Sequence, residues 1–170
     1  GMILKMMALR GFTALAITTV AVSLMNQGVF MTLFPIAAQS EAGLNEGQIG
    51  SLLSIAGVVT LITSFPNGVF VDRYGRKRSL VAGWLIAAVS AVLLAFVVGF
   101  QTALLAATVF GLAQAINMGA NQAFAMDLAP EKERGAFLGV WTLFQSFGAF
   151  IGPLATGIIV EVWGFDAAFY

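Results

Sequence analysis

The chain has 170 residues, of which 59% are hydrophobic and 9% are charged, and its mean hydropathy is +0.94. Soluble domains are nearer a quarter charged, so this composition excludes a soluble globular fold and predicts an all-α integral membrane protein. The sequence contains no cysteine and no histidine, which excludes disulfides, thiol catalysis, Cys/His metal sites and a histidine proton switch within the chain. We therefore expect neither a metal site nor another cofactor.

Five apolar stretches are long enough to cross a bilayer, which takes about 20 residues. We predict spans at residues 11–38, 48–71, 79–98, 103–126 and 135–160, and the start of a sixth span at residue 167. The run Ser79–Met126 holds 48 residues without a charge, and residues 99–102 form the plausible turn that divides it. Pro130 is placed to start the next helix. The first uncharged run, Gly11–Ser40, is too long for the apolar core of a signal peptide, about 7–15 residues.

Charged residues divide unequally between the two sides of the membrane. If the spans alternate in direction, one side receives all eight basic residues, namely Lys5, Arg10, Arg73, Arg76, Lys77, Arg78, Lys132 and Arg134. The loops on the other side carry only Glu41, Glu46, Glu161 and Asp166. Because basic loops stay in the cytoplasm, we predict a multi-pass protein of the cell (inner or plasma) membrane with a cytoplasmic N-terminus.

The densest charge cluster lies between the second and third spans. Residues 72–78 contain one acid and four bases, and Asp127 reaches the same side from the fourth span. An unpaired carboxylate at the membrane edge is costly, so we expect Asp72 and Asp127 to form ion pairs with Arg73 and Arg76. A basic turn that only fixes the topology is the alternative.

Two segments that lie 89 residues apart share their residue types. Residues 68–75 and 157–164 both carry glycine, valine, an acid, an aromatic residue and glycine in that order, and Gly50 and Gly139 have the same offset. The first copy leaves the membrane on the basic side and the second copy on the other side. The pattern predicts an inverted-topology repeat of spans 1–3 against spans 4–6.

The loop pattern Gly68-x-x-x-Asp72-Arg73-x-Gly75-Arg76-Lys77 resembles the signature between helices two and three of the major facilitator superfamily of transporters. The resemblance implies a helical bundle of two halves in which this loop is a cytoplasmic latch. Its aspartate would meet a helix of the other half, and its arginine would meet the acid of the fourth span. Gly68 would allow close helix approach and Gly75 a tight turn. The latch residues implied here are Gly68, Asp72, Arg73, Gly75, Arg76, Lys77 and Asp127.

The fifth span carries Gly148-x-x-x-Gly152-Pro153-x-x-Thr156-Gly157. Its small residues predict close helix packing and its proline predicts a kink, so Gly148, Gly152, Pro153 and Gly157 are the expected packing and hinge residues. The pattern also resembles the antiporter-associated signature of the family, with Thr156 in place of a glycine.

Residues 34–35, 47–50, 127–135 and 163–169 resemble further family positions. The resemblance thus covers nearly the whole chain and points to the drug and metabolite efflux branches. It implies an N-terminal half that stops as the sixth helix begins, with the C-terminal half absent, and we expect this chain alone not to transport.

Polar amides inside the spans are the candidate substrate ligands. They are Asn26 and Gln27 on the first span, Gln114, Asn117 and Asn121 at helical spacing on the fourth, and Gln145 on the fifth. Hydrogen bonding between helices and cavity lining are equally compatible with such residues. In the family, helices one and four line the central path, which favours cavity lining. Uncharged amides suit a neutral polar or amphipathic substrate.

The resemblance implies secondary active transport of a small solute by alternating access, in efflux or antiport, with protons as a candidate coupling ion. Many proton-coupled exporters of the family carry an arginine in helix four, which this chain lacks, and no carboxylate lies mid-span. A uniporter or importer of a neutral metabolite such as a sugar is therefore one alternative. A non-transporting membrane scaffold or receptor is another. We expect a small-molecule substrate, the bilayer and the missing half as partners, no nucleic acid, and no enzymatic activity, because no catalytic constellation is present.

Overall fold

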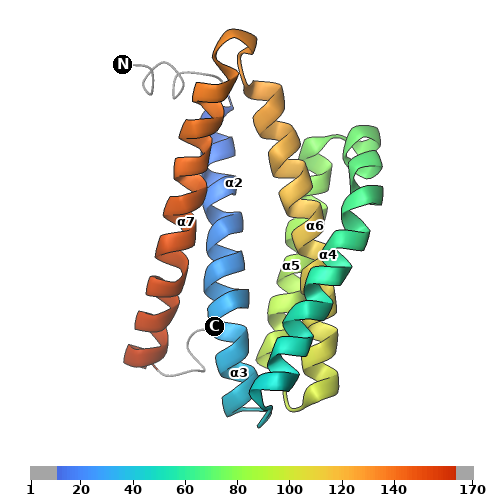
Figure 1. Ribbon diagram of the computed structural model, residues 1–170, viewed down its shortest axis with the longest axis vertical. Helices are drawn as coiled ribbons and strands as arrows, with labels where there is room; N and C mark the ends of the chain where they lie inside the picture. The colour runs from blue at the N-terminus through green and yellow to red at the C-terminus, as the bar shows by residue number, and fades with distance from the viewer. Residues whose placement is uncertain (1–10, 164–170) are drawn as a thin grey trace.

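The computed structural model describes residues 11–163, and these form a bundle of helices (Figure 1). The elements in chain order are α2 (Phe12–Leu24), the π-helix η1 (Met25–Leu33), α3 (Phe34–Ser40), α4 (Glu46–Tyr74), α5 (Arg76–Ala95), α6 (Phe100–Leu128), the 3-10 turn η2 (Glu131–Glu133) and α7 (Arg134–Trp163). Because α2, η1 and α3 run on without a break, the described residues contain five helical rods long and apolar enough to cross a membrane. This confirms the predicted all-α membrane fold. The start of a sixth span at residue 167, like Lys5, Arg10 and Asp166, lies outside the described residues.

The helices pack in two groups. Figure 1 shows α7 beside α2 on one side, and α4, α5 and α6 together on the other. α6 packs extensively against both α4 and α5, while α7 packs along α2 and η1, and α2 also touches α6. The first helix of each three-helix copy thus packs against the second helix of the other copy. This reciprocal packing between the two three-helix copies is expected of an inverted repeat.

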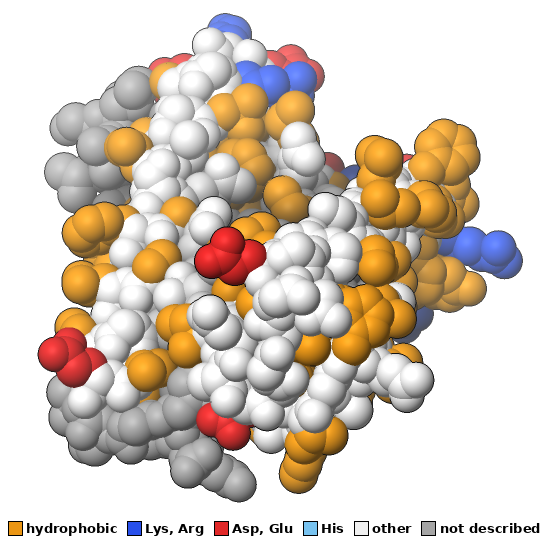
Figure 2. Space-filling model, turned by 60° about the horizontal axis from the view of Figure 1, so that its bottom comes forward, with side chains coloured by type: hydrophobic (Ala, Val, Ile, Leu, Met, Phe, Trp, Pro, Cys, Tyr) orange, Lys and Arg blue, Asp and Glu red, His pale blue; other side chains and the backbone are white. Residues whose placement is uncertain are grey.

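The basic side chains of the described residues all lie at one end of the bundle, together with several acids, whereas the charged side chains at the other end are acidic. Figure 2 looks toward one end, where the charged side chains on the near surface are acidic, while lysine and arginine side chains lie at the top and right edges of the view, with further acidic side chains beside those at the top. The basic end holds the junction of α4 and α5 and the turn η2, whereas Glu41 and Glu46 lie between α3 and α4. The described part of the chain therefore has the charge asymmetry that the sequence predicts.

The turn between the third and fourth spans lies earlier than predicted. α5 ends at Ala95 rather than at residue 98, because Phe96 leaves the helical conformation with φ −109° and ψ 24°. The hydroxyl oxygen of Thr102 accepts from the backbone N–H of Val98 at 3.1 Å and of Gly99 at 3.2 Å. These bonds satisfy amide groups that a helix start leaves without partners, so α6 begins at Phe100.

The first span contains a wide turn that the sequence analysis did not anticipate. Over residues 25–33 the backbone forms a π-helix, in which bonds join residues five apart. The Thr32 hydroxyl donates to the Gln27 carbonyl at 2.8 Å, which spans the same five residues. Pro35 follows directly and supplies no N–H to the preceding turn. Phe30, on the wide turn, stacks on Phe110 of α6 at a centroid distance of 3.9 Å, so the turn is held in the core.

Candidate functional site

A polar cavity of about 280 Å³ lies between the first, fourth and fifth spans. Its walls come from α2 with η1, from α6 and from α7. The lining residues are Val22, Ser23, Asn26, Gln27, Gln114, Met118, Asn121, Gln122, Trp141, Gln145, Ser146 and Ala149. None of these described lining residues is charged. The cavity therefore offers amides, hydroxyls and one indole ring to a solute.

The structure brings together five of the six amides that the sequence analysis proposed as substrate ligands, and places Asn117 elsewhere. Asn117 is buried, with 3% of its surface exposed, and its side chain lies against Gly83 of α5. The reason is helical rotation. Seven residues nearly complete two turns, so Gln114 and Asn121 share a face, whereas Asn117 is rotated about 60° from Gln114 toward α5. Its Oδ1 atom is buried without a hydrogen-bond partner in the described structure.

A buried hydrogen-bond network forms one wall of the cavity. Thr19 of α2, which is fully buried, accepts from the indole Nε1 of Trp141 at 2.8 Å and from the amide Nδ2 of Asn121 at 2.9 Å. The Asn121 Oδ1 atom lies 3.1 Å from the Thr18 hydroxyl. Three helices, α2, α6 and α7, are therefore joined at this point. Buried polar groups at such a crossing fix side-chain orientation because each alternative leaves a group unpaired.

The basic loop contains one close ion pair. Arg76, at the start of α5, places Nε 2.6 Å from Oδ2 of Asp127 and donates a hydrogen bond from Nη2 to Oδ1 at 3.2 Å. The Nε–H bond is not directed at its nearest oxygen, so the Nη2 contact is the hydrogen bond of the pair. Asp72 is more distant, with Oδ1 3.9 Å from Arg76 Nη1, and its side chain is 77% exposed. Arg76 thus joins the acids of the second and fourth spans.

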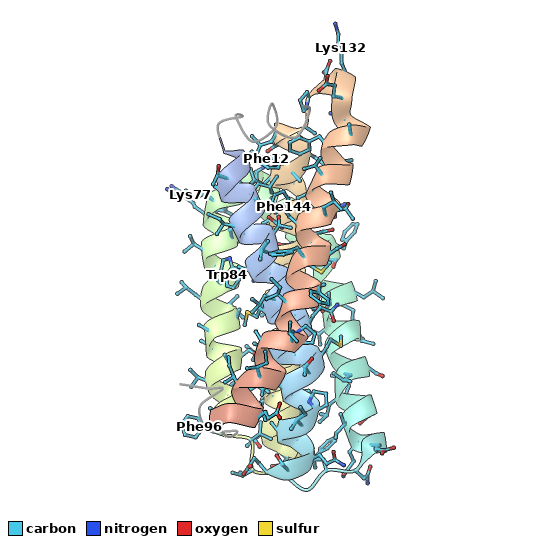
Figure 3. All side chains as sticks on the ribbon, turned by 90° about the vertical axis from the view of Figure 1, so that its left-hand side faces the viewer. Phe12, Lys77, Trp84, Phe96, Lys132 and Phe144 are labelled. Carbon is cyan, nitrogen blue, oxygen red and sulfur yellow. The ribbon has the colours of Figure 1, made fainter. Side chains whose placement is uncertain are left out.

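The other residues of the predicted latch have different surroundings. Arg73 forms no ion pair among the described residues, and its guanidinium lies 5.8 Å from the ring centre of Tyr74. Gly75 has φ +85°, which favours glycine, at the sharp junction of α4 and α5. A Cβ atom on Gly68 would meet nothing within 4 Å, so the close approach expected at Gly68 is not made to any described residue. Lys77 is exposed on α5, and Figure 3 shows it above Trp84 on the same helix.

Glycines hold α7 close to the first span. A Cβ atom on Gly148 would lie 2.6 Å from the carbonyl oxygen of Val20, and one on Gly28 would lie 2.9 Å from the carbonyl oxygen of Gly152. A Cβ atom on Gly157 would meet nothing within 4 Å. Pro153 lies inside α7 at the level of this contact. Nearer the basic end, the rings of Phe12 and Phe144 meet edge to face with their centres 5.7 Å apart; both side chains are labelled in Figure 3.

Comparison with known proteins identifies the family. The family model of the Major Facilitator Superfamily matches residues 16–170, which is most of the chain. The chain belongs to the major facilitator superfamily. It is 31% identical to Multidrug resistance protein 2 of Bacillus subtilis over 68% of this chain and 29% of that protein. It is 27% identical to a Na(+), Li(+), K(+)/H(+) antiporter of Planococcus maritimus over 81% of this chain and 34% of that protein. It is 32% identical to a probable vesicular acetylcholine transporter-A of Danio rerio over 69% of this chain and 23% of that protein.

These matches confirm the resemblance that the sequence motifs indicate. The facilitator chain spans less than half the length of the curated relatives it matches, from 22% to 39% of each. The relatives include antiporters and multidrug resistance proteins, which supports the transport and membrane assignments.

Sequence reasoning missed several residues of the facilitator cavity, above all Trp141 and Gln122. Helical spacing alone could have found both. Gln122 follows Gln114 by eight residues, and Trp141 precedes Gln145 by four, so each shares a face with a predicted amide. Thr19 carries no comparable signal, because a buried threonine in an apolar span resembles any packing residue.

Proposed function

We propose that the intact protein is a secondary transporter that moves a small solute by alternating access, in efflux or antiport. The observation that carries this proposal is the amide-lined cavity between α2, α6 and α7. Burying polar side chains inside a membrane is energetically costly, and here six amides line one cavity. Transporters of this superfamily place the substrate near the bilayer midplane between two rocking halves. The cavity of this chain would supply one wall of that site.

In this proposal the pair Arg76–Asp127 is part of the cytoplasmic gate. It joins the start of α5 to the end of α6, at the end of the bundle where the basic side chains lie. Asp72 is mostly exposed and has only a 3.9 Å contact in this chain, so its carboxylate is free to meet a further partner. We infer that Gly68, Asp72, Arg73, Gly75, Arg76, Lys77 and Asp127 act together as the latch, and that this end faces the cytoplasm of a cell membrane.

The domain organisation is also a proposal. Large apolar side chains of α4 and α7, including Phe65 and Phe150, are exposed, as suits contact with lipid or with a second half. A second groove, of about 580 Å³ and mostly apolar, lies beside Ala14 and Thr18 of α2. α5 packs on α6, so the repeat would place a sixth helix on α2 at this groove. The chain would then be the N-terminal half of a transporter with six helices in each half.

Flux through the complete protein tests the transport proposal. The full gene product would be reconstituted in liposomes, and uptake or release of solutes would be measured with and without a proton gradient. Gradient-driven accumulation supports antiport, whereas absence of flux for every solute would favour a non-transporting scaffold or receptor. The same preparation is expected to show no enzymatic turnover of the solute.

A uniporter or importer of a neutral metabolite such as a sugar is the second candidate. The uncharged lining favours it, because amides and hydroxyls bind hydroxyl groups without selecting a charge. No described residue in the middle of the five spans is a carboxylate that could carry a proton, because the acids of these helices lie near their ends. Flux that follows the solute gradient alone, unaffected by a proton gradient, would decide for this candidate.

A further inference from the structure

The cavity has two chemically different ends, and this difference rests on how its hydrogen bonds are used. The indole of Trp141 has a single N–H, and that group already donates to buried Thr19. The Asn121 side chain is 3% exposed, and its amide nitrogen also donates to Thr19. Trp141 therefore has no hydrogen-bonding group left for a solute, and Asn121 is too buried to offer much, so the accessible amide at this end of the cavity is that of Gln122. Trp141 can offer only the surface of its ring, next to the apolar side chain of Met118.

The amides beyond this end are in the opposite situation. Asn26 and Gln27 lie about two helical turns from Thr19 along the first span, and Gln114 lies as far from Asn121 along α6, which corresponds to about 10 Å on each helix. α2 and α6 run in opposite directions, so both displacements lead toward the same end of the bundle. These side chains, like that of Gln145, line the cavity and form no hydrogen bond with any described residue. Their donors and acceptors are available to a solute.

We propose that Trp141 is the stacking surface of the solute site and that Thr19 is the residue that positions it. The class of solute that follows is uncharged, with a flat aromatic or conjugated ring at one end and several hydrogen-bonding groups at the other. The inference rests on the proposed function, because it assumes that the cavity receives a solute. The described lining residues carry no charge, so this wall of the cavity offers no ion pair to a charged solute, which favours an uncharged one. Stacking geometry requires a ring whose orientation is fixed, and the Thr19 bond fixes it.

A matched pair of neutral glucosides tests the ring requirement. Phenyl β-glucoside and cyclohexyl β-glucoside share the sugar hydroxyls and differ in whether the ring is flat and aromatic. Binding to the complete protein in detergent would be measured by equilibrium dialysis. We expect the phenyl compound to bind roughly three- to tenfold more tightly, the range that aromatic pairing supports. Trp141→Leu should bring the ratio near one, whereas Trp84→Leu, which removes a tryptophan outside the cavity, should preserve it.

The role of Thr19 is tested by two variants of nearly equal size. Thr19→Val removes the acceptor and should lower the phenyl preference, and Thr19→Ser keeps the hydroxyl and should retain it. If the role of Thr19 is purely structural, Thr19→Val would weaken the binding of both glucosides equally and leave the ratio of their affinities unchanged. If Thr19→Val does not elute as a folded monodisperse protein, Trp141→Leu still decides whether Trp141 is the stacking surface, and loss of the preference in Thr19→Ser, which keeps the acceptor, would contradict the positioning role of Thr19.

Equal binding of the two glucosides, binding of neither, or a preference that survives Trp141→Leu would overturn the proposal. These outcomes are distinct from failure of the proposed function. A protein that moves solutes in liposomes without any ring preference retains its transport function and refutes the stacking site. A protein that shows the ring preference without flux retains the site and is a receptor rather than a transporter.

Discussion

Arg76, the first residue of α5, lies against Asp127, one residue before the end of α6, with Nε 2.6 Å from Oδ2. The two residues are 51 positions apart, so the contact fixes how the third and fourth spans meet at the basic end of the bundle. Partly exposed ion pairs of this kind contribute only about 0.2–1 kcal/mol to stability. A large functional effect of breaking the pair would therefore reflect its place in a gate rather than loss of the fold.

Arg76→Ala and Asp127→Asn are expected to lower the transport rate of the complete protein more than its affinity for the solute. The physical reason is that the pair lies at the basic end and does not line the polar cavity. Flux in liposomes and binding in detergent would be measured on the same variants. Asp72→Asn should have the same signature if its carboxylate meets the other half.

Arg78→Ala is the matched control for that prediction, because Arg78 is exposed two residues away, is not one of the latch residues and forms no ion pair in the described structure. Affinity and transport rate that fall together in Arg76→Ala would argue against a gating role.

Gly148→Ala is expected to destabilise the contact between α7 and the first span by about 1–3 kcal/mol, the usual cost of overpacking. The added methyl would meet the Val20 backbone, which cannot move aside as a flexible side chain would. Unfolding of purified protein by titration with denaturing detergent, followed by circular dichroism, would measure the loss. Gly157→Ala is the control on the same helix, since its methyl would meet nothing within 4 Å. An equal change of stability in both variants would show that the contact with the Val20 backbone, which Gly148 makes and Gly157 does not, fails to set the effect.

Gly119→Ala is expected to be destabilising because the new methyl would collide with the amide nitrogen of Asn67. That nitrogen donates to the Ala115 carbonyl at 2.8 Å and joins α4 to α6. Asn67→Ala alone should cost the hydrogen bond, about 0.6 kcal/mol on average in membrane helices, together with lost packing. The double variant should be more stable than the sum of the two single effects predicts, because the collision then disappears. Strict additivity, measured by the same unfolding titration, would contradict a close contact between these two residues.

Thr32→Val is expected to loosen the wide turn of the first span. The threonine hydroxyl donates to the Gln27 carbonyl at 2.8 Å, and valine has the same shape without the donor. Backbone amides of residues 27–33 should then exchange with deuterium faster, as measured by mass spectrometry of peptides. Thr142→Val on α7, where the hydroxyl bonds its own helix four residues back at an exposed site, is the control and should change little. Unchanged exchange around residue 32 would show that the turn is held by packing of Phe30 alone.

The predicted sites differ in how much the sequence could say about them. The loop at residues 72–78 was predictable because its charges lie close together in the chain, yet both Arg73 and Arg76 were plausible partners for the acids. The break between the two helices decides the partner, because Arg76 begins α5 and contacts Asp127, whereas Arg73 lies in the last turn of α4 near Tyr74. Among the amides, Gln114 and Asn121 line the cavity, and Asn117 on the same helix packs against α5.

The sequence by itself determined the membrane class, the five spans, the division of charge and the superfamily. All of these depend on local composition or on short motifs, which the chain carries whatever its neighbours are. The tertiary structure decided what depends on which helices meet and at what rotation. This includes the wide turn at residues 25–33, the bond of Thr19 to Trp141 and the shape of the cavity. In spans where nearly every side chain is apolar, hydropathy hardly distinguishes one helix face from another, so only packing between helices selects the residues that a solute would meet.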